Sequence, residues 1–310
     1  MKTNKPLVSI VTPSFNQGRF IEDTILSVKN QDYPNIEHII VDGGSTDNTL
    51  DILKRYEKEY NLRWISEPDE GQSDAVNKGF RMAKGEIIGW LNSDDVYFTR
   101  DVISYVVEKF RTFHEVDVIY GNTVIIDEEG LILKVRHTIP WFSFARLLRI
   151  NFISQPSTFF KENVIQDYKL DMKIDLPMDY EYWLRIAKDG LKFKYVSKIL
   201  SAERWQTRAK TISRWEEMKA ETRKVQERYG QKFGFQYHLF RITDFTLRFM
   251  LLEPYAIKTI IRLFANFEKQ NFAFSAKFDS LLKTLLRQFI YSPNLISFPF
   301  VKLLLRLSGM

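Results

Sequence analysis

The sequence predicts an α/β fold with a mostly parallel, doubly wound sheet, and three observations support this prediction. Short apolar runs rich in Val and Ile alternate with helical patterns over the first 120 residues. The connections between these runs and patterns are short, and polar or acidic clusters follow several of the apolar runs. Strands that alternate with helices through short connections are typical of a parallel sheet with helices packed on its faces.

The regular part of this pattern ends near residue 120. Its expected elements, in chain order, are a strand at 7–12, a helix at 19–30, a strand at 36–41, a helix at 48–60, a strand at 62–66, a helix at 74–84, a strand at 86–91, a helix at 102–113 and a strand at 116–120. The first strand (LVSIVT) is closed by Pro13, and Ser45 or Thr46 is a candidate N-cap for the second helix.

The pattern after residue 120 is less regular. An Asp-Glu-Glu-Gly turn at 127–130 lies between two apolar runs, which indicates a hairpin. The further expected elements are strands at 122–126 and 131–137, a short helix near 141–149, a strand at 155–160, a helix at 178–187, strands at 192–197 and 199–203, and a charged helix at 213–229. We therefore expect one domain over residues 1–235, followed by a tail at 236–310.

The composition excludes several classes of protein. A hydrophobic content of 45% supports a packed core and argues against disorder. The chain has no cysteine, so disulfides and cysteine-based metal or nucleophile chemistry are excluded. The apolar run at the N-terminus is too short for a signal peptide. No window of about 18 residues is free of charge and strong polarity, so we predict no transmembrane helix.

The net basic charge of the chain lies in its tail. From Leu239 to the C-terminus there are ten Lys and Arg against four Asp and Glu, a charge of +6 that equals the net charge of the whole chain. Segments 255–267 and 278–291 have the spacing of amphipathic helices with a broad apolar face. Such basic helices suit an anionic membrane surface, and packing on the rest of the chain or in a homodimer is the alternative. The basic residues form no dense stripe, so nucleic acid is not an expected partner.

A candidate site lies at one edge of the expected sheet. Ligands of open α/β sheets bind beyond the carboxyl ends of the strands, and the run at 86–91 ends there in Asn92-Ser93-Asp94-Asp95. Because side chains alternate along a strand, we expect Asp94 and Asp95 to point to different sides, one toward a bound sugar or ribose and the other toward a divalent cation. The glycine-rich dinucleotide motif and the Walker A motif are missing, which argues against a dehydrogenase and a P-loop ATPase.

Four segments together resemble a known family. SIVTPSFNQ, VDGGSTDNT, EPDEGQSDAVNKG and GEIIGWLNSDD, in this order, resemble the motifs of family 2 glycosyltransferases with the GT-A fold. The resemblance covers roughly residues 7–210 and implies an inverting transferase that uses a nucleotide-sugar and Mg²⁺ or Mn²⁺. It further implies a nucleotide-sugar-binding half at 1–121 and an acceptor half at 122–235, which the basic amphipathic helical tail at 236–310 follows.

The resemblance also implies roles for individual residues on the donor side. The donor-binding set is Pro13, Ser14, Phe15, Asn16, Asp42, Gly43, Ser45, Asp74, Lys78, Asn92, Ser93 and Asp94. Within it, residues 13–16 would line the base and ribose, and Asp42 would accept a hydrogen bond from the base. Asp95, with help from Asp94, would ligate the metal on the diphosphate. The family often has Asp where this chain has Asn92.

The catalytic base is expected in the acceptor half. Asp179, before a Trp-Leu pair, matches the residue that takes the proton from the acceptor hydroxyl, and Glu181 is the alternative. Arg204, Arg208 and Lys210 match a loop that closes over the diphosphate. This loop departs from the family pattern, because Gln206 stands where His is usual and Ala209 where Ser is usual.

The expected function is the transfer of a sugar from a UDP- or GDP-linked donor to a hydroxyl of a lipid-linked saccharide or glycan, in the assembly of bacterial cell-surface polysaccharide or glycolipid. The expected location is cytoplasmic, on the inner face of the cell membrane. One alternative is a non-catalytic sugar-nucleotide-binding or membrane scaffold protein. Another is a sugar-phosphate nucleotidyltransferase, which requires a glycine-rich, arginine-containing loop after the first strand that residues 13–18 do not provide.

Overall fold

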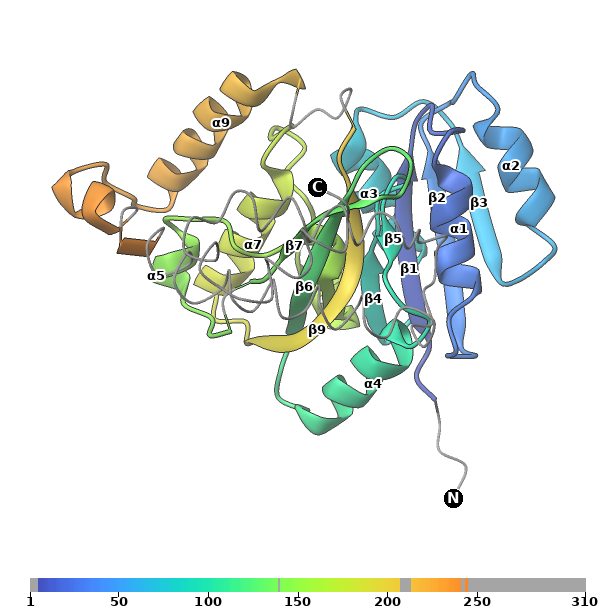
Figure 1. Cartoon of the computed structure of the whole chain (residues 1–310), viewed down its shortest axis with the longest axis horizontal. Helices are drawn as coiled ribbons and strands as arrows, with labels where there is room; N and C mark the ends of the chain where they lie inside the picture. The colour runs from blue at the N-terminus through green and yellow to red at the C-terminus, as the bar shows by residue number, and fades with distance from the viewer. Residues whose placement is uncertain (1–4, 139, 207–212, 241–242, 245–310) are drawn as a thin grey trace, which may run out of the picture.

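The computed structural model describes residues 5–138, 140–206, 213–240 and 243–244. These residues form one curled, nine-stranded sheet that is flanked by helices (Figure 1). The strands follow the order β3-β2-β1-β4-β8-β6-β9-β5, and β7 pairs with β6. The prediction of an α/β fold is therefore confirmed.

The strands are β1 Val8–Ser14, β2 Ile36–Asp42, β3 Leu62–Ser66, β4 Ile87–Trp90, β5 Val96–Tyr97, β6 Val118–Ile126, β7 Ile132–Arg136, β8 Thr158–Lys161 and β9 Phe193–Arg204. The helices are α1 Ile21–Lys29, α2 Thr49–Tyr56, α3 Gln72–Met82, α4 Val102–Thr112, α5 Phe144–Leu147, α6 Glu162–Asp167, α7 Met178–Lys188 and α9 Trp215–Arg228, with the short 3-10 helix η1 at Gln155–Ser157. The strand β5 and the helix α6 were not expected from the sequence.

The first part of the sheet is parallel, as predicted. β1 pairs with β2 on one side and β4 on the other, and β2 pairs with β3. All seven residues of β1 are buried, which explains its nearly continuous run of apolar residues. Helix α3 packs closely on β1, because a Cβ at Gly79 would lie 2.3 Å from Val11 Cγ1.

The second part of the sheet is mixed, which the sequence did not predict. β8 lies between β4 and β6 and is antiparallel to both, whereas β9 is parallel to β6. β6 and β9 are each one strand where two were expected, so the boundary expected between residues 121 and 122 falls inside β6. Gly121 interrupts the apolar pattern for a packing reason, because a Cβ there would lie 2.7 Å from Leu200 Cγ on β9.

An aromatic core holds α7 against the sheet. Tyr182 and Trp183 are fully buried, and their rings lie 6.3 and 6.2 Å from the ring of Phe160 on β8. Burial of one large apolar side chain contributes about 1.5–3 kcal/mol to stability. This packing fixes the first turn of α7, which carries Asp179.

The start of the expected tail packs on the domain. Asp244 is buried and accepts hydrogen bonds from Arg146 on α5, at 3.0 Å from Nε and 2.7 Å from Nη2. The two amphipathic segments predicted further along, at 255–267 and 278–291, lie outside the described residues. Within the part of the chain that the structure describes, no helix is both long and apolar enough to cross a membrane.

Candidate active site

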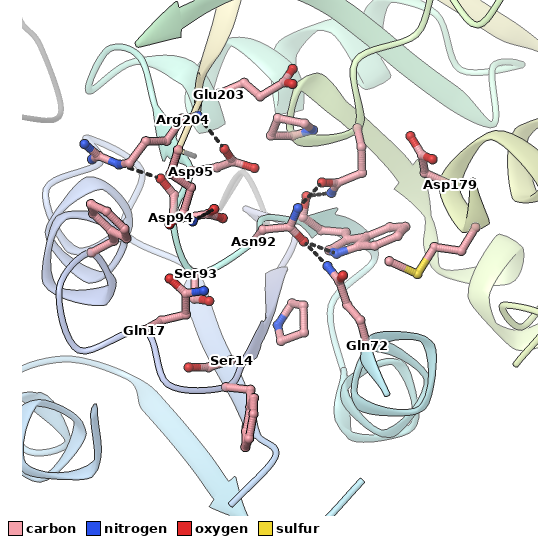
Figure 2. Close-up of a pocket in the computed structure, with 18 of the residues that line it drawn as sticks. Ser14, Gln17, Gln72, Asn92, Ser93, Asp94, Asp95, Asp179, Glu203 and Arg204 are labelled. Carbon is pink, nitrogen blue, oxygen red and sulfur yellow. Dashed lines mark hydrogen bonds between the residues drawn. The ribbon is translucent and has the colours of Figure 1, made fainter. Parts of the chain in front are cut away.

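A cleft of about 1000 Å³ opens at the carboxyl ends of β1 and β4. Of the residues singled out from the sequence, those that line it are Pro13, Ser14, Phe15, Asn16, Asn92, Ser93, Asp94, Asp95, Asp179 and Arg204. Asp94 and Asp95 lie on one side of the pocket and Asp179 on the other (Figure 2). The fold therefore brings both parts of the chain together around one space.

The loop after β1 forms one end of the cleft. Phe15 is 58% exposed there, although aromatic side chains are usually buried. Asn16 has a positive φ of 51°, and its side-chain oxygen accepts a hydrogen bond from the N–H of Thr46 at 2.8 Å. Its own N–H donates to Ser45 Oγ at 2.7 Å. These bonds hold the loop in an unusual conformation that presents the Phe15 ring to the cleft.

Asp42 holds this loop in place through hydrogen bonds. It is fully buried, and its carboxylate accepts hydrogen bonds from the N–H groups of Gly44 and Ser45 and from the hydroxyls of Ser45 and Ser66, at 2.5–3.1 Å. Asp42, Gly43 and Ser45 are not among the residues that line the cleft. Asp42 therefore positions this loop through Ser45 and Asn16, and its direct contact with a base stays a prediction.

Asn92 is the centre of a hydrogen-bond network on the cleft floor. Its side-chain oxygen accepts from Gln72 Nε2 at 2.9 Å and from Trp90 Nε1 at 3.0 Å, as Figure 2 shows for Gln72. Its amide nitrogen donates to Gln155 Oε1 at 3.0 Å. An aspartate at this position could not make the bond to Gln155 Oε1, because a carboxylate only accepts. The departure from the family pattern at Asn92 thus matches its surroundings.

Asp94 and Asp95 lie in a turn and not in a strand. β4 ends at Trp90, and the N–H of Asp95 donates to the carbonyl of Asn92 at 3.1 Å. Strand alternation therefore does not apply, and both residues line the same cleft, contrary to the expectation that they point to different sides.

The pKa values of both carboxyls are raised. The main cause is burial, and for Asp95 the charges of Asp94 and Glu203 add to it. One oxygen of each carboxylate is engaged, since Asp94 Oδ2 accepts from Gln206 Nε2 at 2.6 Å and Asp95 Oδ1 accepts from the N–H of Arg204 at 2.9 Å. The other oxygen of each has no hydrogen-bond partner among the described residues. The turn therefore places two carboxylates, each with one such oxygen, in the lining of the cleft.

Arg204 connects four segments of the chain through hydrogen bonds. Its guanidinium donates to the carbonyls of Asp94, Asp127 and Glu128 at 3.0–3.1 Å and to Asp23 Oδ2 at 2.8 Å. The side chain is only 1% exposed. These contacts tie the end of β9 to α1, the β6–β7 turn and the Asp94-Asp95 turn. They favour a structural role for Arg204 over the closure on a diphosphate that the sequence predicted.

Asp179 and Glu181 have different surroundings although they are two residues apart. Asp179 lines the cleft, and burial raises its pKa to about 6, with a smaller raising effect from Glu203. Glu181 is buried away from the cleft, where it pairs with Arg185 at 3.1 Å and accepts from Tyr229 Oη at 2.6 Å. Between the two, only Asp179 is placed to exchange a proton with a bound molecule.

The remaining predicted residues lie elsewhere. Asp74 and Lys78 on α3 form an ion pair at 3.2 Å, Lys78 also pairs with Glu67 at 2.9 Å, and neither residue of α3 lines the cleft. Arg208 and Lys210 lie outside the described residues.

Several residues that line the cleft were missed by the sequence reasoning. The main ones are Gln72, Arg136, Ser154, Gln155 and Glu203. The segment 155–160 had been given no chemical role, yet Gln155 holds Asn92. Glu203 is the first charged residue at the end of the run ILSA, and a charge at the end of a strand is a signal that could have indicated a site residue.

Comparison with known proteins identifies the family. Residues 9–168, slightly more than half of the chain, match the sequence profile described as "Glycosyl transferase family 2". The chain belongs to glycosyltransferase family 2. The resemblance of the four motifs is thereby confirmed.

The chain is similar to part of a much longer protein. It is 30% identical over 199 residues to the chondroitin synthase of Pasteurella multocida (strain Pm70), a match that covers 63% of this chain and 20% of that protein. The chain thus spans about a fifth of the length of this relative.

Two solved structures share the fold of the glycosyltransferase. Residues 1–349 of S. aureus TarS in complex with UDP-GlcNAc superpose with a TM-score of 0.58 at 16% identity, over 97% of this chain and 92% of that chain. The mannosyltransferase PcManGT from Pyrobaculum calidifontis, in complex with GDP-Man and Mn²⁺, superposes with a TM-score of 0.58 at 18% identity, over 99% and 87%. These matches confirm the GT-A-type fold.

Proposed function

We propose that this glycosyltransferase moves a sugar from a UDP- or GDP-linked donor to an acceptor hydroxyl with inversion at the anomeric carbon. The observation that carries the proposal is the single cleft in which the Asp94-Asp95 pair faces Asp179 across the pocket. A cation-attracting pair and a poised base on opposite sides suit a donor diphosphate at one end and an acceptor hydroxyl at the other. The two ligand-bound structural neighbours support a nucleotide-sugar as the donor.

The chemical step is a single displacement. Asp179 accepts the proton of the acceptor hydroxyl, and the hydroxyl oxygen forms a bond to the anomeric carbon. The bond from that carbon to the diphosphate oxygen breaks, and the nucleoside diphosphate leaves with the electron pair. Attack on the face opposite the leaving group inverts the configuration. A general base in this role contributes a factor of about 10²–10⁴ to the rate, and positioning of the two substrates in one cleft supplies much of the rest.

The donor end of the cleft suits a nucleotide. The exposed ring of Phe15 offers an apolar face for a base, and Pro13, Asn16 and Ser93 line the same cleft. The carboxylates of Asp94 and Asp95 would repel the diphosphate, so the donor needs a cation between them and its phosphates.

Mg²⁺ or Mn²⁺ fits this donor set. Mg²⁺ takes one or two carboxylates and completes its shell with phosphate oxygens and water, and Asp94 and Asp95 each have one carboxylate oxygen that no other described residue contacts through a hydrogen bond. Over the described residues, no cluster of three or more His, Cys, Asp or Glu side chains could hold a metal alone. The ion would therefore depend on the donor as well as on this pair, and when bound it would neutralise charge on the departing diphosphate.

The acceptor and the cellular context are part of the proposal. A lipid-linked saccharide or a glycan would supply the acceptor hydroxyl, in the assembly of bacterial cell-surface polysaccharide or glycolipid. The polysaccharide synthases among the relatives support this context. Attachment to the inner face of the cell membrane through the basic tail, and a homodimer, are further expectations that belong to the same proposal.

A thermal-shift panel tests the donor and the metal. UDP- and GDP-sugars are each added with and without Mn²⁺, and one nucleotide with the metal is expected to raise the melting midpoint. At a ligand concentration of about 100 times Kd the gain is about 2.7 kcal/mol. Asp95→Asn is expected to lose the part of the shift that needs Mn²⁺, because it removes one charge from the metal pair.

The matched control is Asp51→Asn, the same change at an exposed aspartate on α2 that does not line the cleft, which is expected to keep the shift. The absence of a shift with every combination would contradict the proposal and favour the non-catalytic scaffold.

The rate of transfer is expected to increase with pH through about 6. Burial raises the pKa of Asp179 to about 6, and only its ionised form can accept the proton. Below that pH, kcat/KM for the acceptor should rise about tenfold per unit and should level off above about pH 7. Initial rates between about pH 5 and 8 measure this, and a flat profile over the range would rule out Asp179 as the base.

A further inference from the structure

Part of the cleft wall is made by a half-buried ion pair between Glu203 and Arg136. Glu203, at the end of β9, accepts hydrogen bonds through Oε2 from Arg136 Nη1 at 3.1 Å and from Ser154 Oγ at 3.3 Å. Arg136 ends β7, and Ser154 directly precedes η1. All three residues line the cleft. Three separate segments therefore hold one carboxylate in place.

This carboxylate keeps an open position toward the cleft. Glu203 Oε1 has no hydrogen-bond partner among the described residues, and the side chain is 28% exposed. Arg136 is 41% exposed, and within the part of the chain that the structure describes its Nη1 is the guanidinium nitrogen with a hydrogen-bond partner. In Figure 2 the carboxylate of Glu203 points away from Asp95, toward the side of the pocket where Asp179 lies. A fixed acceptor beside fixed donors is an arrangement that can bind the hydroxyl groups of a sugar.

We propose that Glu203, held by Arg136 and Ser154, binds a hydroxyl of a neutral saccharide acceptor next to the hydroxyl that Asp179 deprotonates. This inference rests on the proposed function, to which it adds the class of acceptor and a specificity-determining residue. Glu203 contacts the acceptor in this arrangement and takes no part in proton transfer.

The charges around Glu203 favour a neutral acceptor over an anionic one. Each of the three arginines that line the described cleft already has a carboxylate partner: Arg19 pairs with Glu128, Arg136 with Glu203, and Arg204 with Asp23. The charge of Glu203 also raises the pKa of Asp179, which shows that the two carboxylates are within electrostatic reach of each other. A carboxylate or phosphate on the acceptor would be repelled by the charges of Asp179 and Glu203. Each arginine of the described lining is already paired with a carboxylate, so none is left to offset this repulsion.

Binding of matched sugars tests this inference without requiring turnover. The probes are p-nitrophenyl glucoside with p-nitrophenyl glucuronide, and the galactoside with the galacturonide, since the members of each pair differ only at C6, where a hydroxymethyl group is replaced by a charged carboxylate. Affinities are measured by saturation-transfer NMR with the full chain, alone and with UDP and Mn²⁺. At least one neutral sugar is expected to bind fivefold or more tightly than its uronide. Glu203→Gln is expected to weaken that sugar roughly tenfold, because a charge-assisted hydrogen bond becomes a neutral one.

Glu128→Gln is the matched control, since it removes the same charge from another glutamate that lines the cleft and pairs with an arginine; it is expected to leave the affinity unchanged. Arg136→Gln is the second variant in case Glu203→Gln fails to fold, and it is expected to weaken the same sugar severalfold. Absence of binding by all four probes, uronides that bind as tightly as the neutral sugars, or unchanged affinity in Glu203→Gln and Arg136→Gln would each overturn the inference.

The outcome is separable from that of the proposed function. A nucleotide and metal shift together with Glu203-independent sugar binding would leave the transferase proposal intact and remove the acceptor assignment. Sugar binding that depends on Glu203, without any nucleotide shift, would support the subsite and contradict the transferase proposal.

Discussion

Replacing Asp179 by asparagine is expected to lower the rate of sugar transfer by a factor of about 10²–10⁴, which is the usual contribution of a general base. The amide has nearly the same shape as the carboxylate but cannot take the acceptor proton. Donor affinity is expected to stay within about twofold, because the proposed donor end of the cleft lies on the opposite side of the pocket from Asp179. Single-turnover transfer and the nucleotide thermal shift, measured on the same sample, separate the two effects.

The control for this variant is Glu181→Gln, the same change two residues further along α7. Glu181 is turned away from the cleft and pairs with Arg185 and Tyr229, so its loss should reduce stability by about 1–3 kcal/mol and leave transfer within a fewfold. If Asp179→Asn transfers at the rate of the unmodified chain, the base lies elsewhere, and Glu181 is the first residue to examine.

The same substitution is expected to stabilise the protein at neutral pH. Folding raises the pKa of Asp179 from its ordinary value of 3.8 to about 6, so the folded state binds this proton more tightly than the unfolded state does. The charged carboxylate therefore costs stability as the pH rises from about 4 through about 6. Removal of this charge should add up to about 3 kcal/mol above pH 7 and nothing below pH 4. Thermal melts at the two pH values show whether the gain follows this course.

Replacing Arg204 by methionine is expected to lower the free energy of unfolding by about 2–4 kcal/mol. The guanidinium satisfies the carbonyls of Asp94, Asp127 and Glu128 in a nearly closed environment, and buried groups left without partners cost about 1–3 kcal/mol each. Methionine keeps an unbranched chain of similar length without the donors. Urea denaturation with an unchanged slope would report the loss as one of stability.

Arg19→Met provides the comparison for Arg204. Arg19 also lines the cleft and pairs with Glu128, but its side chain is 60% exposed, and exposed ion pairs contribute about 0–1 kcal/mol. If Arg204→Met is as stable as the unmodified chain and instead loses donor affinity, the direct diphosphate contact expected from the sequence is correct. The structural role inferred for Arg204 is then wrong.

The first part of the fold could be predicted because its strands and helices depend on residues that are close together in the sequence. β1, β2 and β4 are buried almost throughout, so each contains Val or Ile residues in close succession and is followed by a polar cluster, although Glu37 and His38 interrupt the run in β2. The parallel order and the edge that carries the site then follow from general rules for α/β sheets. Asp94, Asp95 and Asp179 line one cleft, and the motif resemblance was needed to single out Asp179 among the acids of the second half.

The parts that escaped prediction depend on contacts between distant segments. Nothing near β8 in the sequence shows that it inserts antiparallel between β4 and β6. The positioning role of Asp42 rests on a hydroxyl contributed by Ser66 as well as on its own turn. Glu203 is a single acid whose partners, Arg136 and Ser154, are 67 and 49 residues away in the chain. The spacing of residues within one segment does not predict which distant residues will contact it.

Both parts of the chain contribute strands to one sheet. This arrangement determines when the site can form as the chain leaves the ribosome. The turn that carries Asp95 is fastened by the N–H of Arg204, 109 residues later, and β4 beside it lacks one neighbour until β8 has been made. A nascent chain that stops before β8 would hold all four sequence motifs without the partners that shape them. Pairing over such separations is slow compared with local helix formation. Donor binding should therefore appear late in synthesis, as one event with completion of the sheet.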